Sequence, residues 1–174
     1  MCIRDRLMLT IPTNFKNDIE GKDTNLFPLV SLKIAVAGHS PDSLFLSTNQ
    51  YSWNKFDGTE VYTTIPILLN VPSLKESIDV EKRNYKISNV TLNLSNAPYN
   101  GVKFSDLVGG NSLINIECRI YWVSPSTNAM IAVDIPGNDY SNLEDNWSLS
   151  PFFEVYFGTI RRYTHDDEKV QIQL

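Results

Sequence analysis

A two-residue alternation of apolar and polar side chains runs through most of this sequence after residue 28, and it constrains the fold more than any other feature. The clearest run spans residues 113–123. The apolar members of this run, which we expect on one face of a strand, are Ile114, Ile116, Cys118, Ile120 and Trp122. Successive side chains of a β-strand point to opposite faces, so the run predicts a strand with one buried face.

Similar patterns occur along the rest of the chain. They predict further strands over residues 29–36, 44–46, 62–69, 77–82, 85–94, 130–135, 152–163 and 168–174. A helical pattern is confined to residues 104–108, with Ser105 as its start and Gly109-Gly110 as its end. Eight or nine short strands with almost no helix predict an all-β fold, an antiparallel β-sandwich or barrel with long loops and at most one short helical turn.

Three residues or pairs interrupt the alternation, and each predicts a local irregularity. The pattern changes phase after Ile87, which predicts a β-bulge near Ser88-Asn89. Pro66 has no backbone N–H to donate, so its strand should lie at a sheet edge or carry a bulge. Gly158 fits a bulge within the strand over residues 152–163, whose apolar side chains, Phe157 among them, should point inward.

Turn signals separate the predicted strands. Residues 49–60 resemble a loop, with Asp57-Gly58 as a hairpin signal. Pro98 and Gly101 predict a turn between the strand that ends near residue 94 and the helical turn.

Chain length favours one domain. With 174 residues the chain can bury a sizeable core, and we assign residues 29–174 to one β-domain and residues 1–28 to an N-terminal arm with loops. Residues 1–6 resemble the translation of sequencing-adapter bases at the edge of an assembled environmental read. The alternation over residues 168–174 continues to a terminal apolar residue, so we expect a fragment of a longer protein, truncated at its C-terminus.

Charge and cysteine content exclude several classes of protein. Fifteen basic and twenty acidic residues give a net charge of −5, which argues against binding to nucleic acid. No apolar run of about 18 residues is present, so we expect no membrane span. Two cysteines are too few for a disulfide framework, and Cys118 is predicted to be a buried free thiol.

Catalytic and metal-binding motifs are missing from the sequence. It has no G-x-S-x-G nucleophile elbow, and His39, Ser40 and Asp42 stand too close together in one predicted turn to form a triad. Two histidines do not suffice for a zinc site. The acidic loop over residues 134–145 could supply oxygen ligands for calcium, but it lacks the EF-hand order and we interpret it as solvated. We therefore predict no enzyme activity, no cofactor and no metal.

Aromatic residues in predicted loops are the candidate contact residues. They could contact a partner protein or a glycan, because aromatic side chains give a large contact area at a low entropy cost. The alternative is that they fold back over the ends of the sandwich. The six residues are Tyr51, Trp53, Phe56, Tyr99, Tyr140 and Trp147.

Several of these segments, taken together, resemble tail and virion structural proteins of tailed bacteriophages. The strand Lys86-Ile87-Ser88-Asn89-Val90-Thr91-Leu92-Asn93-Leu94-Ser95-Asn96 is followed by Phe104-Ser105-Asp106-Leu107 and then by the strand over residues 114–122. In residues 157–174 an aromatic-Gly-x-Ile strand enters a hairpin whose return strand alternates. The resemblance covers residues 75–174.

The resemblance implies a structural module of a phage tail tip or baseplate hub. Such a module would assemble in the host cytoplasm through contacts with other virion proteins, in a homo-oligomeric ring, and would have no catalytic residues. A carbohydrate-binding β-sandwich for host recognition is the alternative that the loop aromatics leave open. A hydrolase whose site is not visible in the sequence is a third, because one fold can host many functions.

Overall fold

The computed structural model describes residues 11, 13–21, 26–34, 43–54, 61–70, 73, 76–79, 84–87, 90–109, 112–124 and 152–174. This part of the chain contains two short helices and eleven strands, and all of its strand pairs are antiparallel. The elements are α1 (Thr13–Ile19), β1 (Phe27–Leu32), β2 (Leu44–Ser47), β3 (Ser52–Asn54), β4 (Val61–Thr63), β5 (Glu76–Asp79), β6 (Asn84–Ile87), β7 (Thr91–Ser95), α2 (Phe104–Val108), β8 (Glu117–Val123), β9 (Phe152–Thr159), β10 (Arg162–His165) and β11 (Lys169–Gln173). The predicted all-β class is confirmed.

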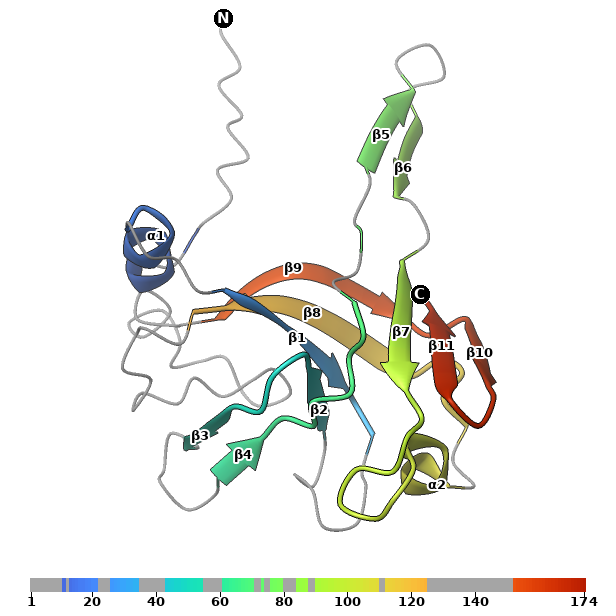
Figure 1. The fold of residues 1–174 in the computed structure, drawn as a ribbon. Helices are drawn as coiled ribbons and strands as arrows, with labels where there is room; N and C mark the ends of the chain where they lie inside the picture. Colours follow the sequence, from blue (N-terminus) through green and yellow to red (C-terminus); the bar gives the residue numbers. More distant parts are fainter. Residues whose placement is uncertain are drawn as a thin grey trace, which may run out of the picture.

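Two sheets form the body of the protein (Figure 1). The first has the strand order β2-β1-β8-β9 and the second has the order β10-β11-β7. β3 pairs with β4, and β5 pairs with β6, as two separate hairpins. The sheets do not close into a barrel, so of the two predicted architectures the sandwich describes the fold better.

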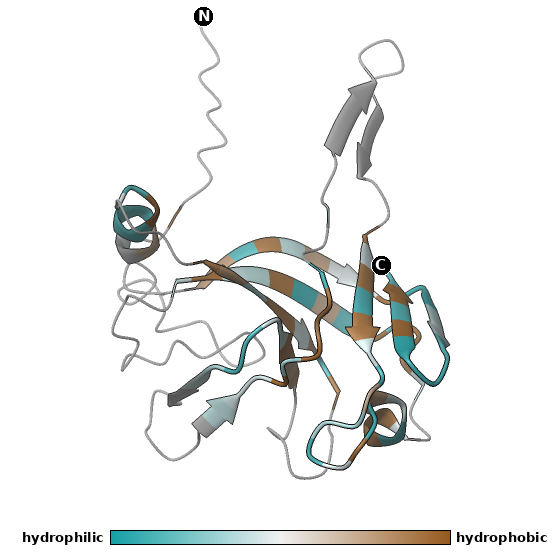
Figure 2. Cartoon of the chain, viewed as in Figure 1, coloured by the Kyte–Doolittle hydropathy of each residue, from teal (hydrophilic) through white to brown (hydrophobic). Residues whose placement is uncertain are grey.

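One apolar core joins the two sheets. The first sheet contributes residues such as Val30, Leu46 and Ile120, and the second contributes Leu92 and Ile172, all of them almost completely buried. β7 and β11 alternate between hydrophobic and hydrophilic residues along their length (Figure 2). Their apolar face therefore packs inward, as the alternation predicts.

β1 differs from its prediction in both extent and burial. The sequence predicts a half-buried strand over residues 29–36, but β1 begins at Phe27, ends at Leu32 and is buried at all six positions. Its two faces belong to two clusters. Val30 and Leu32 pack in the main core, whereas Phe27 and Leu29 belong to a second cluster on the opposite face of the same sheet. A central strand covered on both faces does not need polar residues on either one.

The stretch over residues 85–94 is not one bulged strand, and that prediction was wrong. β6 ends at Ile87 and pairs with β5, while β7 begins at Thr91 and pairs with β11. The phase change in the sequence marks a boundary between strands of different sheets, and the predicted bulge residues themselves lie outside the described residues. The burial of Val90, Leu92 and Leu94 agrees with the prediction.

β8 begins four residues later than predicted. Ile114 precedes it and is 43 % exposed, and Asn115 takes a positive φ of 67° that ends the predicted alternation. Within the strand, Cys118 and Ile120 are buried in the main core, as predicted. Trp122 is only half-buried, near α1 at the end of the sheet.

β9 carries its bulge three residues before Gly158. Ile120 pairs with Tyr156 and Tyr121 with Glu154, which leaves Val155 as the extra residue. Gly158 instead pairs with Cys118 in the regular ladder. A Cβ atom at Gly158 would lie 2.6 Å from the hydroxyl of Tyr156, so any larger residue there would force the Tyr156 ring to move.

The predicted strand over residues 62–69 is interrupted after Thr63, whereas Pro66 predicted a continuous edge strand or a bulge. β4 ends at Thr63, and the following residues connect the two sheets through isolated bridges: Ile65 pairs with Leu46 of β2 and Leu68 pairs with Leu94 of β7. β3 and β4 form the hairpin that Asp57-Gly58 predicted, although that dipeptide lies outside the described residues.

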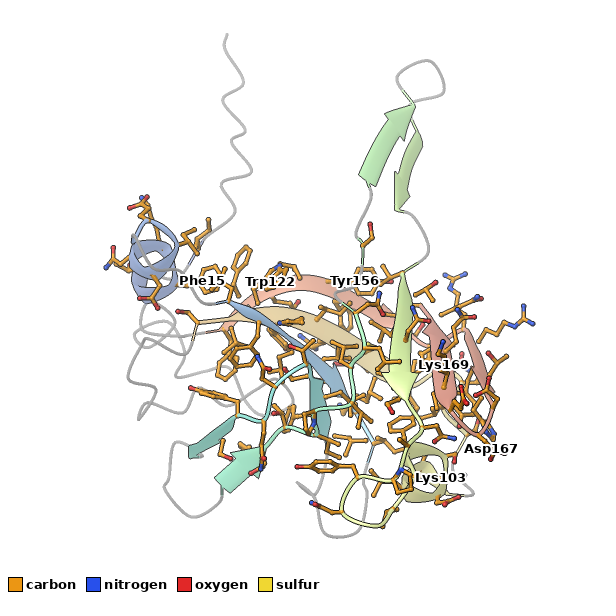
Figure 3. All side chains as sticks on the ribbon, in the orientation of Figure 1. Phe15, Lys103, Trp122, Tyr156, Asp167 and Lys169 are labelled. Carbon is orange, nitrogen blue, oxygen red and sulfur yellow. The ribbon has the colours of Figure 1, made fainter. Side chains whose placement is uncertain are left out.

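Both helices differ from the sequence prediction, α1 in its existence and α2 in its N-cap residue. α1 lies in the predicted N-terminal arm and is a second helix beyond the single helical turn expected. Its Phe15, labelled in Figure 3, is 3 % exposed and stacks on Phe153 of β9 at 5.3 Å between ring centroids. Ser124 donates a hydrogen bond to Asp18 of the same helix. α2 is the predicted helical turn and ends before Gly109, but Lys103 rather than Ser105 occupies its N-cap.

Candidate functional site

Four of the six predicted contact residues have side chains outside the described part of the structure. Phe56, Tyr140 and Trp147 belong to segments that the structure does not describe, and Trp53 is described only as a backbone position of β3, opposite Tyr62. The predicted strand over residues 130–135, the turn with His39 and the acidic loop over residues 134–145 also lie outside the described residues. Tyr51 and Tyr99 remain to be placed.

Tyr51 packs against the sheet. Its ring lies 5.3 Å from the ring of Phe27 in an edge-on arrangement, and its backbone N–H donates to the hydroxyl of Thr64 at 2.8 Å. Burial raises the pKa of the Tyr51 phenol above its ordinary value. This side chain therefore covers the second apolar cluster, which is the folded-back arrangement that the sequence left open.

Tyr99 lines a small apolar hollow beside α2. It precedes a tight turn in which Asn100 and Gly101 take positive φ angles of 53° and 83°, and it pairs with Val102 across that turn. The hollow has a volume of about 100 Å³. Its lining residues are Ile65, Ile67, Ala97, Tyr99, Asn100, Val102, Phe104 and Leu107. Tyr99 is half-buried, so of the two candidates described in full it is the one that could contact a ligand.

Asn96 ties together the elements around this hollow. Its side chain is 1 % exposed; it accepts a hydrogen bond from the N–H of Ser105 at 3.0 Å and donates one to the carbonyl of Asp166 at 2.6 Å. Close by, Lys103 forms an ion pair with Asp167 at 3.1 Å (Figure 3). The start of α2 is thus fastened to the turn between β10 and β11.

β9 is the outermost described strand of the larger sheet. It is the last strand in the order β2-β1-β8-β9, and among the described residues no further strand pairs with it. Phe157 of β9 is 56 % exposed, although the sequence predicted an inward position. The prediction was wrong because Phe157 shares a face with Arg119, its partner in β8, and not with the main core.

A charged cluster lies beside Phe157 on that face. The Arg119 guanidinium donates to Glu117 at 2.7 Å and to Glu154 at 2.9 Å, and its central carbon lies 4.4 Å from the centre of the Phe157 ring. Burial lowers the pKa of Arg119, but the hydrogen bonds to the two carboxylates raise it by more, so the group stays charged. Two carboxylates and one guanidinium leave a formal charge of −1.

The β5–β6 hairpin stands away from the sandwich (Figure 1). Its register pairs Ile78 with Tyr85 and Glu76 with Ile87. Since directly opposed residues and residues two apart share a face, positions 76, 78, 85 and 87 form one face of the hairpin. Three of these four positions are apolar in sequence. The segment thus has the pattern of a strand pair with one buried face.

Cys118 is a free, buried thiol, as predicted. Burial raises its pKa to about 12, so it remains protonated at neutral pH. Within the described ranges, no group of three or more His, Cys, Asp or Glu residues could hold a metal ion. No helix in the same part of the chain is long and apolar enough to cross a membrane.

No family model matches the chain, and none of the curated proteins shows significant similarity to it. The resemblance to phage virion proteins therefore depends on the sequence motifs alone.

Proposed function

We propose that this protein is a structural module of a phage virion, located in the tail tip or baseplate hub. It acts through contacts with other virion proteins and with further copies of itself in a ring, and it assembles in the host cytoplasm without catalysing a reaction. The observation that carries the proposal is the run of motifs over residues 75–174, since no other part of the sequence points to one class of protein.

The placement of those motifs in the fold supports an assembly role. They make up the projecting β5–β6 hairpin, strand β7, helix α2, strand β8 and the β10–β11 hairpin. Among the described strands of this region, β9 and β10 each stand last in the order of their sheet, so no described strand pairs with their outer edges. An open edge exposes backbone donors and acceptors, and adding a strand to such an edge is a common form of protein association.

Immunogold electron microscopy tests the proposal. An antibody raised against the 174-residue chain should label one end of the tail on particles of a phage whose genome encodes the chain. Mass spectrometry of the same particles should detect peptides of this chain together with tail proteins. Particles that lack these peptides, or labelling confined to the capsid, would contradict the proposal.

A carbohydrate-binding module for host recognition is the second candidate, and the Tyr99 hollow is the observation that favours it. Aromatic rings beside polar loop residues are suited to contact sugar faces. A glycan array would test this function directly. Saturable binding that is lost on Tyr99→Ala but kept on Tyr163→Ala, a half-buried tyrosine on β10, would favour the second candidate over the first.

A further inference from the structure

The turn over residues 99–102 presents an asparagine followed by a glycine at the surface. The backbone groups of Tyr99 and Val102 exchange two hydrogen bonds, at 2.9 and 3.1 Å, across this turn. Its two central residues, Asn100 and Gly101, have φ angles of 53° and 83°, and positive values at both positions are typical of a type I′ turn. Both residues are exposed, in the loop that joins β7 to α2 (Figure 1).

The two groups that could react with each other in this turn are not held by other partners. Among the described residues, no hydrogen bond engages the side-chain amide of Asn100 or the backbone N–H of Gly101. A Cβ atom added at Gly101 would meet nothing within 4 Å, so the space around its backbone is open. Solvent base and water can therefore reach the Gly101 nitrogen, and no side chain on Gly101 hinders its approach to a neighbouring carbonyl carbon.

The turn can bring these groups together without opening. The Gly101 nitrogen reaches the Asn100 side chain when the central peptide of the turn rotates. Such a rotation converts a type I′ turn into a type II′ turn, and both types have a positive φ at the first central residue, which Asn100 already has. Gly101 can take either sign of φ. The hydrogen bonds between Tyr99 and Val102 flank the rotating peptide and do not include it.

We propose that Asn100 is a site of spontaneous deamidation, through a cyclic imide formed with Gly101. The Gly101 nitrogen loses its proton to solvent base and attacks Cγ of Asn100. A Cγ–N bond forms, the Cγ–Nδ2 bond breaks, and Nδ2 takes up a proton from solvent and leaves as ammonia. Water then opens the imide. Addition at Cγ breaks the new bond and gives aspartate, whereas addition at the main-chain carbonyl carbon of residue 100 leaves the chain joined through Cγ and gives isoaspartate.

The reaction alters the hollow beside α2. Asn100 is one of its lining residues, next to Tyr99. Either product replaces a neutral amide with a carboxylate there, and isoaspartate also adds a methylene group to the main chain of the turn. The charge and shape of the hollow therefore change as the molecule ages. This conclusion does not depend on the proposed function, because the reaction needs only the chain and water.

Timed incubation of the full chain, followed by peptide mass spectrometry, tests the proposal. Asn49 is a matched control in the same molecule, since it is also exposed but is followed by Gln50, whose side chain hinders the nitrogen. Asn100 should be converted more than about tenfold faster than Asn49 in the folded chain. Conversion should be faster in mildly alkaline than in mildly acidic buffer, because the deprotonated nitrogen is the nucleophile. Electron-transfer fragmentation distinguishes isoaspartate from aspartate.

Gly101→Ala tests the role of the glycine. The added methyl group crowds the attacking nitrogen, so conversion at Asn100 should become about tenfold slower. Alanine is strained at a φ of 83°, but the comparison with Asn49 uses the wild-type chain and does not depend on how the variant folds. Conversion of Asn100 no faster than that of Asn49, or conversion only after the chain is unfolded in urea, would overturn the proposal.

Discussion

At the scale of single residues, Asn96 holds together parts of the chain that lie far apart in sequence. Its side chain bonds to the N–H of Ser105 and to the carbonyl of Asp166, and it is almost completely buried. Asn96→Ala leaves both of these backbone groups without their partner. We expect a loss of about 2 kcal/mol in the free energy of unfolding, measured by urea denaturation. Asn93→Ala, three residues away on β7, should change it by less than about 0.5 kcal/mol.

Cys118 predicts how the stability of the protein depends on alkaline pH. Burial raises the pKa of its thiol to about 12, whereas the pKa of an unfolded cysteine is about 8.5. The stabilising effect is complete below the lower value, and it is lost as the pH rises toward the higher one, because only the unfolded chain then releases a proton. Burial also raises the pKa of Tyr51, Tyr156 and Tyr163, so these tyrosines contribute to the alkaline pH dependence as well. The contribution of the thiol is therefore isolated by comparing the wild-type chain with a variant that lacks it.

Cys118→Ala is the appropriate variant. At pH 8 it should be less stable than the wild-type chain, because it leaves a small cavity in the core. The difference in free energy of unfolding should narrow between about pH 9 and pH 12, since only the wild-type chain loses the contribution of the thiol. A constant difference across this range would show that the thiol ionises equally well in the folded state.

At the scale of secondary-structure elements, the β5–β6 hairpin and the sandwich should differ in local stability. β7 and β11 are paired with each other and alternate buried apolar residues, whereas the hairpin forms a separate two-stranded sheet. In the monomer, backbone amides of β5 and β6 should exchange with deuterium more than about tenfold faster than those of β11. Mass spectrometry after timed labelling measures this ratio. Slow exchange in the hairpin of a monomer would mean that its own chain already stabilises it.

The sequence alone could predict those elements that bury one face in the core and expose the other to solvent. β7 and β11 follow their alternation, and α2 ends at its glycine, because local pattern and tertiary burial agree there. β1 could not be predicted in full, since the covering of both its faces depends on two distant clusters. The division between β6 and β7 was equally hidden: a phase change in sequence fits a bulge as well as a change of sheet.

The candidate site was less predictable than the fold. Alternation indicates which residues share a face of a strand, but it does not show whether another layer covers that face. Phe157 was therefore expected inside, although its face is partly open and its strand ends the sheet order. Tyr51 is a different case, because the sequence left open whether this loop aromatic contacts a partner or folds back, and its ring packs on Phe27. Edge positions are a property of the complete topology, so no local signal marks them.

At the scale of the whole molecule, the core couples the two sheets into one unit. Leu46 of β2 and Leu92 of β7 are both fully buried in the same cluster, although they belong to different sheets. The segment between β4 and β5 adds a backbone bridge to each sheet, from Ile65 to Leu46 of β2 and from Leu68 to Leu94 of β7. A shared core with shared backbone links leaves no boundary at which the sheets could separate, so we expect a single unfolding transition.

Two matched substitutions test this coupling. Leu46→Ala and Leu92→Ala remove the same side chain from opposite layers, and each should lower the free energy of unfolding by about 2–5 kcal/mol. Far-UV circular dichroism and tryptophan fluorescence should give coincident urea transitions for both variants, because loss of either layer exposes the other. Leu69→Ala, at a position that is 52 % exposed, should leave the transition almost unchanged. If Leu92→Ala moved one probe and not the other, the second sheet would unfold independently and the sandwich would consist of two weakly coupled layers.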